Sequence, residues 1–323
     1  MTALPNYSSN FANPILDMLL FRESLGYCKT TYAYELKDFD AFCSAHYPQQ
    51  TCLTKELTLA WGSKRDNENE NGHRIRQLAV RQLGQYMRLQ GIDAYVLPTE
   101  YLAQPQKYMP YLFTDDELIR FSQVIDTIPH TGNGSFEDYT LPVFFRIAYG
   151  CGLRPNELFN LRRYDVHFDD KYIFVYFSKT KRDRIVPVTD DLLDICKKYD
   201  VLAQRSFPNR QRFFYIPEGC EGRSWFRYRL KKYWEKAGLT AISGKTPRIY
   251  DFRHNFATRI LMKWFDDGVD ISAMIPYLSA YMGHVQFHST MYYIHMLPER
   301  VRNNRRFDWN MFGSLLPEVP YED

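Results

Sequence analysis

Apolar residues recur at helical spacing over most of the chain. Four segments of the first hundred residues show this spacing: 12–25, 30–46, 54–63 and 72–90. A further helix is predicted after Thr114, where Thr-Asp-Asp-Glu precedes apolar residues as in a capping box. Two β-rich runs, 171–177 and 183–188, are joined by a short basic turn and predict a hairpin. The pattern therefore predicts a mainly α protein with a small β-hairpin or sheet.

The length and the distribution of proline divide the chain. A chain of 323 residues is long for one core, so two domains are expected. Pro98, Pro105 and Pro110 fall in a stretch of little periodicity, which is typical of an interdomain linker. We therefore expect a helical domain over residues 1–92, a linker over 93–113, and an α-rich domain over 114–323 that contains the hairpin.

The basic residues are clustered although the net charge is small. The formal charge of +3 does not by itself indicate nucleic-acid binding, and residues 1–110 hold 11 basic and 11 acidic side chains. Residues 74–90 carry four arginines and no acid, and residues 223–232 carry five basic residues and no acid. Such clusters can neutralise phosphates, although solvated helix faces would show the same pattern. The residues expected to contact DNA are Arg74, Arg76, Arg81, Arg88, Arg223, Arg227, Arg229, Lys231 and Lys232.

The helix at 72–90 combines an apolar side with an arginine stripe. Arg74, Arg81 and Arg88 recur every seven residues and so share one stripe. The side expected to pack against the domain carries the apolar residues Ile75, Leu78, Val80 and Leu83. A helix of this kind is suited to docking on a duplex.

Other features argue against a zinc site, a disulfide framework or a membrane segment. The six cysteines are scattered without a CxxC pair, and no apolar run reaches the length of about 18 residues needed to span a bilayer. We therefore expect a soluble, cytoplasmic protein that needs no metal or other cofactor.

Four local patterns in the second domain carry candidate chemistry. In chain order they are GLRPNEL (152–158), SKTK (178–181), YDFRH (250–254), and MGH (282–284) with Tyr293 nine residues after the histidine. Each pattern alone is weak, because the chain has 25 tyrosines and most are structural. Two arginines, a lysine, a histidine and a late tyrosine in this order are much less expected by chance.

Taken together, these patterns resemble the tyrosine recombinase (phage integrase, Cre and Xer) family, across nearly the whole chain. GLRPNEL resembles the first arginine box and YDFRHNFAT the second, usually written H-x-L-R-H. The N-terminal helices resemble the family's core-binding domain, without an additional arm-binding domain, as in Cre or Xer. The resemblance implies site-specific recombination of double-stranded DNA. The catalytic set that it implies is Arg154, Lys179, Tyr250, Arg253, His284 and Tyr293.

The residue types suit transfer of a DNA strand. Arg154 and Arg253 can hold phosphate oxygens with forked hydrogen bonds, and His284 can add another. Tyr293 is the expected nucleophile rather than the adjacent Tyr292 because of its spacing from His284. The resemblance implies a 3′-phosphotyrosyl ester, and Lys179 on the hairpin is the expected acid for the departing 5′-hydroxyl.

The remaining residues of these boxes have other expected roles. Tyr250 departs from the family, which usually has His or Lys there, and this leaves the general base open. Glu157 is expected to pair with a neighbouring basic residue. His254 is expected to support packing or to touch the phosphate.

Two alternative functions and one assembly hypothesis remain. Related residues occur in type IB topoisomerases, which relax DNA without exchanging partners, and a catalytically inactive DNA-binding protein could keep the same scaffold. The residues after Tyr293 include a basic stretch and then the apolar residues Trp309, Met311, Phe312, Leu315 and Leu316. This tail is expected either to fold onto its own domain or, as the resemblance implies, to dock on a neighbouring subunit in a tetramer that holds two duplexes.

Overall fold

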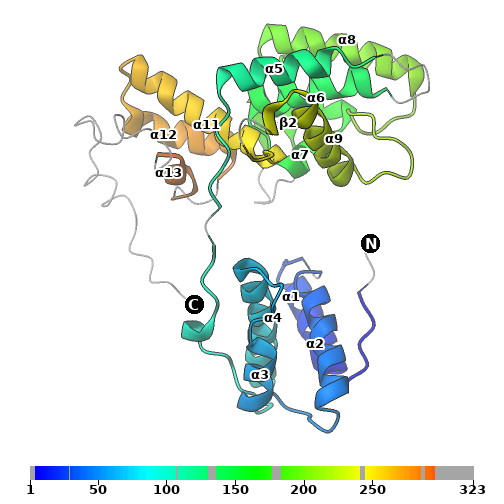
Figure 1. Cartoon of the computed structure of the whole chain (residues 1–323), viewed down its shortest axis with the longest axis vertical. Coiled ribbons are helices and arrows are strands. Elements are labelled where there is room, and N and C mark those ends of the chain that lie inside the picture. The colour runs from blue at the N-terminus through cyan, green and yellow to red at the C-terminus, as the bar shows by residue number, and fades with distance from the viewer. Residues whose placement is uncertain are drawn as a thin grey trace. The chain divides into compact units, whose positions relative to one another are not determined.

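The computed structural model describes residues 4–28, 30–106, 108–129, 136–176, 183–240, 244–284 and 288–294. The chain divides into two compact units between Tyr108 and Met109 (Figure 1). Both units are mainly helical, as the apolar pattern predicts. Within the described ranges, no helix is long and apolar enough to cross a bilayer.

The first unit is a small helical bundle. Its helices are α1 (Ala12–Ser24), α2 (Ala33–His46), α3 (Lys55–Gly62), α4 (Glu70–Leu89) and the short 3-10 helix η1 (Thr99–Tyr101). Helix α4 contacts the other three α-helices, and aromatic side chains including Phe39 and Trp61 fill the core between them. The four helices predicted from the apolar spacing are therefore confirmed.

The packed side of α4 differs in part from the predicted one. Val80 and Leu83 are buried as expected, but Ile75 is 44% exposed. A period of 3.6 residues places His73, Arg76 and Gln77 on the inward side together with Val80, and Ile75 falls outside that arc. The inward face of this helix is thus polar at its N-terminal end.

Residues 94–103 pack onto α4, although they belong to the segment expected to be a linker. Ala94, Leu97 and Leu102 in this stretch are each less than 5% exposed. The first unit therefore includes part of the chain that we expected to connect the domains.

The second unit contains the remaining helices and the sheet. Its helical elements are α5 (Asp115–Asp126), α6 (Glu137–Cys151), α7 (Pro155–Phe159), the 3-10 helix η2 (Arg163–Asp165), α8 (Asp190–Ser206), α9 (Gly222–Lys236), α11 (Ile249–Asp266), α12 (Ile271–Met282) and α13 (His288–Ile294). Thr114 caps α5 through the predicted capping box with Glu117. Helix α6 packs against α5, α8 and α11, so it lies at the centre of the unit.

A small antiparallel sheet accompanies these helices. Strands β2 (Tyr172–Val175) and β3 (Arg184–Pro187) form the predicted hairpin, with Val175 opposite Arg184. A two-residue strand, β1 (Val166–His167), adds a third strand on the far side of β2. Ile173 and Val186 point into the core, which anchors the hairpin to the helices.

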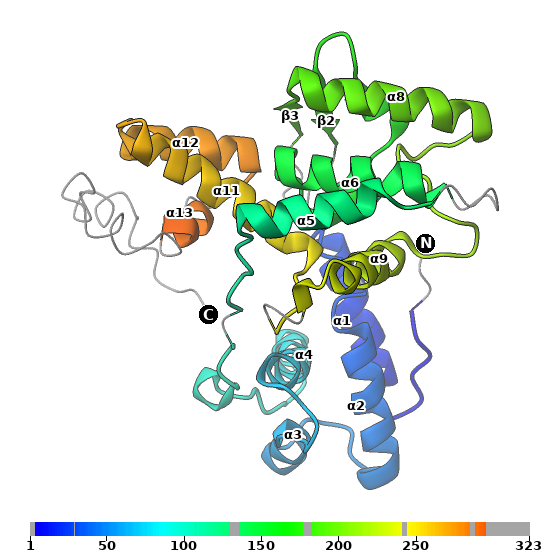
Figure 2. The same cartoon turned by 45° about the horizontal axis from the view of Figure 1, so that its top comes forward.

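Two apolar clusters stabilise the second unit. The larger cluster is rich in phenylalanine and lies among α5, α6, α8, α9 and the sheet. The smaller cluster joins α11, α12 and α13, three helices that lie close together in Figure 2. It includes the ring of Tyr293. Because α11 contributes to both clusters, it connects the element carrying Tyr293 to the body of the unit.

Candidate active site

The turn between α6 and α7 carries Arg154. Gly152 ends α6 in the left-handed conformation with φ of 58°, and Arg154 is the residue that precedes the first turn of α7. A Cβ atom on Gly152 would lie 2.5 Å from Cδ1 of Phe256 on α11. The tight fit requires glycine at this position and fixes the path of the chain into Arg154.

The end of α12 supplies the second part of the site. Gly283 closes α12 in the left-handed conformation with φ of 63° and directs the chain into His284. The carbonyl oxygen of Gly283 accepts a hydrogen bond of 2.5 Å from Nη2 of Arg154. The first arginine box and the final histidine box therefore meet across this contact.

Arg253 on α11 lies at the centre of the site and is fully buried. Its Nη1 donates to the carbonyl of Gly152 at 2.8 Å, and its Nη2 donates to the carbonyl of Met282 at 2.6 Å. Nη2 also donates to Nε2 of His284 at 3.0 Å. One guanidinium thus holds together the turns that precede Arg154 and His284.

His284 is held as a neutral imidazole. Since its Nε2 accepts from Arg253, its Nδ1 carries the proton and donates to the hydroxyl of Thr290 at 2.7 Å. Burial, together with the charges of Arg253 and Arg154, lowers the pKa of His284 to about 3. Thr290 is fully buried on α13, so it fixes both the tautomer and the orientation of the ring.

Tyr293 on α13 faces these cations. Its side chain is 2% exposed, and its ring stacks on His284 with centroids 6.0 Å apart and an interplanar angle of 18°. Burial raises the pKa of Tyr293 to about 12, although the positive charge of Arg253 acts in the other direction and lowers it. Tyr292 is the more exposed of the two adjacent tyrosines. The geometry brings Tyr293, rather than Tyr292, to the arginines.

Glu157 pairs with basic residues, as expected from the sequence, and one of its partners was not predicted. The carboxylate accepts from Nη1 of Arg154 at 2.9 Å, and it takes two hydrogen bonds, of 2.9 and 2.7 Å, from Arg184 on β3. Burial raises the pKa of Glu157, but the hydrogen bonds and charge of Arg184 and Arg154 outweigh burial and lower it. Neither Arg184 nor Thr290 was predicted from the sequence, because the only local signal for either residue is its nearness in sequence to a candidate residue.

Tyr250 and His254 lie one turn apart at the start of α11. Tyr250 is 39% exposed and its ring lies 4.8 Å from that of His254. His254 is 8% exposed, and it also contacts the ring of Tyr293 at 5.5 Å. Burial and the charge of Arg253 lower the pKa of His254 to about 4. His254 therefore packs as a neutral ring beside the candidate nucleophile, while Tyr250 stays open to a ligand.

Two expectations fall outside the described residues. Lys179 belongs to the stretch 177–182, and the apolar tail follows residue 294. Among the residues that are described, no group of three or more His, Cys, Asp or Glu side chains is arranged to hold a metal ion.

The basic residues of α4 bind main-chain carbonyls of the first unit. Arg74 donates to the carbonyl of Ala103 at 2.9 Å, Arg88 donates to that of Ala94 at 2.6 Å, and Arg81 donates to that of Leu97. The arginine stripe identified in the sequence thus holds residues 94–103 against the helix.

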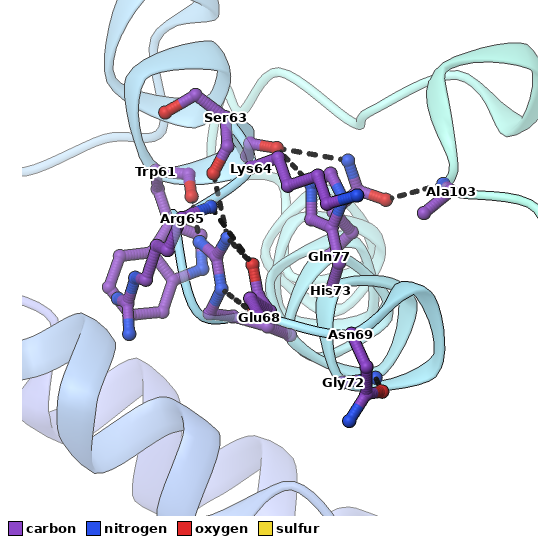
Figure 3. Close-up of polar contacts among 12 residues, drawn as sticks. Trp61, Ser63, Lys64, Arg65, Glu68, Asn69, Gly72, His73, Gln77 and Ala103 are labelled. Atoms are coloured by element: carbon purple, nitrogen blue, oxygen red, sulfur yellow. Dashed lines mark hydrogen bonds and ion pairs between the residues drawn. The ribbon is translucent and has the colours of Figure 1, made fainter.

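Arg76 was expected to face DNA, but it is only 4% exposed. It donates to both oxygens of Glu68 at 2.8 and 2.7 Å and to the carbonyl of Ser63 at 2.7 Å. Figure 3 shows this polar cluster, in which the side chain of Gln77 also joins Ala103 to the end of α3. Arg76 stabilises the interior of the unit and is not open to a phosphate.

The basic residues of α9 are more accessible. Arg223, Arg227, Lys231 and Lys232 are exposed, and Arg223 donates to the side-chain oxygen of Asn156, two residues after Arg154. Arg229 differs, because it pairs with the buried Glu137 at 2.9 Å. Four of the five basic residues expected on this helix are therefore available to a ligand.

The fold and the arginine, histidine and tyrosine boxes define a class of protein. The model of the phage integrase family matches residues 113–300, and the chain belongs to this family of tyrosine-type recombinases.

Individual relatives extend the likeness beyond the matched region. Tyrosine recombinase XerA of Thermococcus onnurineus is 30% identical over 234 residues, which are 70% of this chain and 72% of that protein. The y4rB protein of Sinorhizobium fredii is 26% identical over 309 residues, 92% of this chain and 96% of that protein. Among solved structures, XerH site-specific recombinase bound to palindromic difH substrate, in a post-cleavage complex, shares the fold with a TM-score of 0.64. It is 17% identical, over 93% of this chain and 90% of that one.

Proposed function

We propose that this protein is a site-specific DNA recombinase that cuts and rejoins strands through a covalent ester on Tyr293. The observation that carries the proposal is the convergence of the tyrosine with three phosphate-binding side chains. Arg253 donates to His284, His284 stacks on Tyr293, and Arg154 is hydrogen-bonded to the turn that precedes His284.

The two arginines retain donors for a phosphate. Of the five N–H groups of Arg253, three are used by Gly152, Met282 and His284, and its Nε has no hydrogen-bond partner among the described residues. Arg253 is fully buried, so a phosphate reaches its remaining donors only after the side chains that cover them, such as that of Tyr293, move aside. Arg154 uses one N–H for Glu157 and one for Gly283. Because the used donors fix each guanidinium, the unused ones are preorganised for the charge that develops in the transition state. Removing one such donor typically costs about 3–4 kcal/mol of transition-state stabilisation.

The nucleophile is protected until DNA arrives. A phenol with a pKa of about 12 is neutral at physiological pH and reacts poorly. When its oxygen attacks phosphorus, the bond to the 5′ oxygen breaks and a 3′-phosphotyrosyl ester forms, with Lys179 giving the leaving oxygen its proton. Since the ester conserves the bond energy, a 5′-hydroxyl can attack it and restore the strand without ATP.

Further residues complete the proposed DNA contacts. Tyr250 keeps an exposed phenol beside the site and can donate a hydrogen bond to the same phosphate. The exposed basic residues of α9 supply phosphate contacts along the duplex. On α4, Arg88 is exposed and keeps donors beyond the one used by Ala94, whereas Arg76 is left out.

We also propose that the protein acts as a tetramer on two duplexes, with the segment after Tyr293 docking on a neighbouring subunit. The apolar residues of this segment support the proposal, because exposed they would promote aggregation. Truncation after Arg306 is expected to leave binding to a single site unchanged and to abolish the slowly migrating synaptic complex. Unfolding of the truncated protein would instead assign the tail to its own core.

The test is covalent capture of DNA. Purified protein is incubated with nicked duplexes of randomised sequence, adducts are isolated in denaturant, and the attached DNA is sequenced to obtain the target site. Tyr293→Phe is expected to abolish adducts while binding persists, and Tyr292→Phe, the matched control, is expected to keep them. Adducts that persist in Tyr293→Phe but vanish in Tyr292→Phe would refute the assignment of the nucleophile.

The captured DNA target site also makes it possible to distinguish the recombinase from the two alternative functions. A topoisomerase-like enzyme would relax supercoiled plasmid without exchanging strands between two copies of the site. An inactive DNA-binding protein would shift the site in a gel without forming an adduct. Exchange between two copies of the captured site is the outcome that we expect.

A further inference from the structure

Arg184, at the start of β3, contacts two segments that surround the candidate active site. Its side chain is 9% exposed. Nη1 and Nη2 donate to the two oxygens of Glu157 at 2.9 and 2.7 Å, and Nε donates to the carbonyl of Tyr281 at 2.9 Å. A Cβ atom on Gly283 would lie only 3.1 Å from its Nη1. Arg184 thus contacts α7 beside Arg154 and the α12 end beside His284, without being a residue of either box.

The charges around Glu157 give this contact a chemical consequence. Arg154 and Glu157 alone would form a neutral pair, because the carboxylate lies 2.9 Å from the guanidinium that should bind the phosphate. Arg184 adds a second positive charge at the same carboxylate, so the three side chains carry a net charge of +1. All three side chains are largely buried, where the dielectric is low. A net charge of +1 there attracts a phosphate much more strongly than a neutral pair would.

Arg184 also fixes the geometry of the turn. It holds the carbonyl of Tyr281, and the carbonyl of Gly283 in the same turn is the acceptor for Arg154. Loss of Arg184 would therefore loosen an acceptor that orients Arg154 and leave Glu157 with one partner. Small displacements of this kind can lower a rate about 100-fold.

We propose that Arg184 is a positioning residue for strand cleavage: it offsets the charge of Glu157, so that Arg154 presents a full positive charge to the scissile phosphate. The proposal rests on the proposed function. It requires no contact between Arg184 and DNA.

The experiment compares a charged with an uncharged scissile group. The substrates are two suicide duplexes of the captured target site, one with an ordinary phosphodiester and one with a methylphosphonate, in which a methyl group replaces a non-bridging oxygen and removes the charge. The first-order rate of adduct formation is measured for wild type and Arg184→Gln. We expect Arg184→Gln to lose about 100-fold on the phosphodiester and less than about tenfold on the methylphosphonate.

A second substitution tests the charge balance directly. Glu157→Gln added to Arg184→Gln removes the carboxylate that neutralises Arg154, while the amide oxygen can still accept its hydrogen bond. We expect the double variant to regain at least about tenfold in rate on the phosphodiester over Arg184→Gln. It also avoids a poorly compensated buried carboxylate, so it remains informative if the single variant does not fold.

A matched control exists in the same unit. Arg163 and Arg210 both bind the buried carboxylate of Asp200, as Arg154 and Arg184 both bind that of Glu157. The side chain of Arg210 is 7% exposed. Arg210→Gln is expected to lower stability without changing the ratio of rates on the two substrates.

Three results would overturn the proposal. They are equal losses on the two substrates in Arg184→Gln, a double variant as slow as or slower than Arg184→Gln, or a change of the rate ratio in Arg210→Gln as large as that in Arg184→Gln. Failure of wild type to form any adduct would instead contradict the proposed function.

Discussion

Replacement of Gly152 by alanine tests whether the turn into Arg154 is as tightly determined as its contacts indicate. The backbone there has φ of 58°, a conformation that costs a non-glycine residue about 1–2 kcal/mol. The new Cβ atom would also lie 2.5 Å from Cδ1 and 2.7 Å from Cγ of Phe256, and relieving such overlap in a packed core costs about 1–3 kcal/mol. We therefore expect Gly152→Ala to lower the free energy of unfolding by about 2–5 kcal/mol.

Gly238 provides the matched control in the same unit. It has φ of 73°, but a Cβ atom there would meet nothing within 4 Å. Gly238→Ala should therefore show only the backbone cost of about 1–2 kcal/mol. The free energies are measured by urea unfolding monitored by tryptophan fluorescence. Equal destabilisation by the two substitutions would refute the overlap with Phe256. So would a double-mutant cycle in which Phe256→Ala relieves none of the cost of Gly152→Ala.

Three further predictions concern the chemistry of the site. The pKa of His254 is about 4 in the folded protein and about 6.5 in the unfolded chain, so its contribution to stability is complete above pH 6.5 and is lost as pH falls toward 4. His254→Gln should remove about 2 kcal/mol of the destabilisation seen between pH 8 and pH 5, as measured by urea unfolding. Lys179→Ala should cleave a 5′-bridging phosphorothioate far better than ordinary DNA, because a thiolate leaves without a proton, and equal impairment on both would assign Lys179 to binding. Adduct formation should persist in excess EDTA, because in the proposed mechanism Arg154 and Arg253 meet the phosphate charge, and loss restored by magnesium would contradict this mechanism.

The parts of the protein that could be predicted are those determined by local sequence. The helices of the first unit follow from apolar spacing, and the hairpin follows from two β-rich runs on either side of a basic turn. Strand β1 has two residues and depends on pairing with β2, so no local pattern indicates it. Arg253 and His284 could be located because each belongs to a short motif.

Side-chain roles set by distant contacts could not be predicted. Arg184 binds Tyr281, 97 residues further along the chain, and only the fold brings the two together. Arg76 of α4 shows the converse error, because an arginine on a basic helix is equally compatible with binding phosphates and with binding groups of its own unit. Periodicity identifies the face of a helix, whereas the partner of that face depends on the path of residues 94–103.

The contacts at the junction of the two units limit the length of chain that connects them. Asn71 exchanges two hydrogen bonds with the backbone of Gln106, and Asn255 binds the backbone of Tyr111 and Phe113. Residues 107–110 alone separate these attachment points, and five Cα-to-Cα steps extend to about 18 Å at most. On a duplex that rises 3.4 Å per base pair, this length corresponds to about five base pairs. In the proposed function, a connection this short would limit how far the DNA contacts of the N-terminal unit can lie from the phosphate at Tyr293, so we expect related target sites to differ in sequence more readily than in spacing.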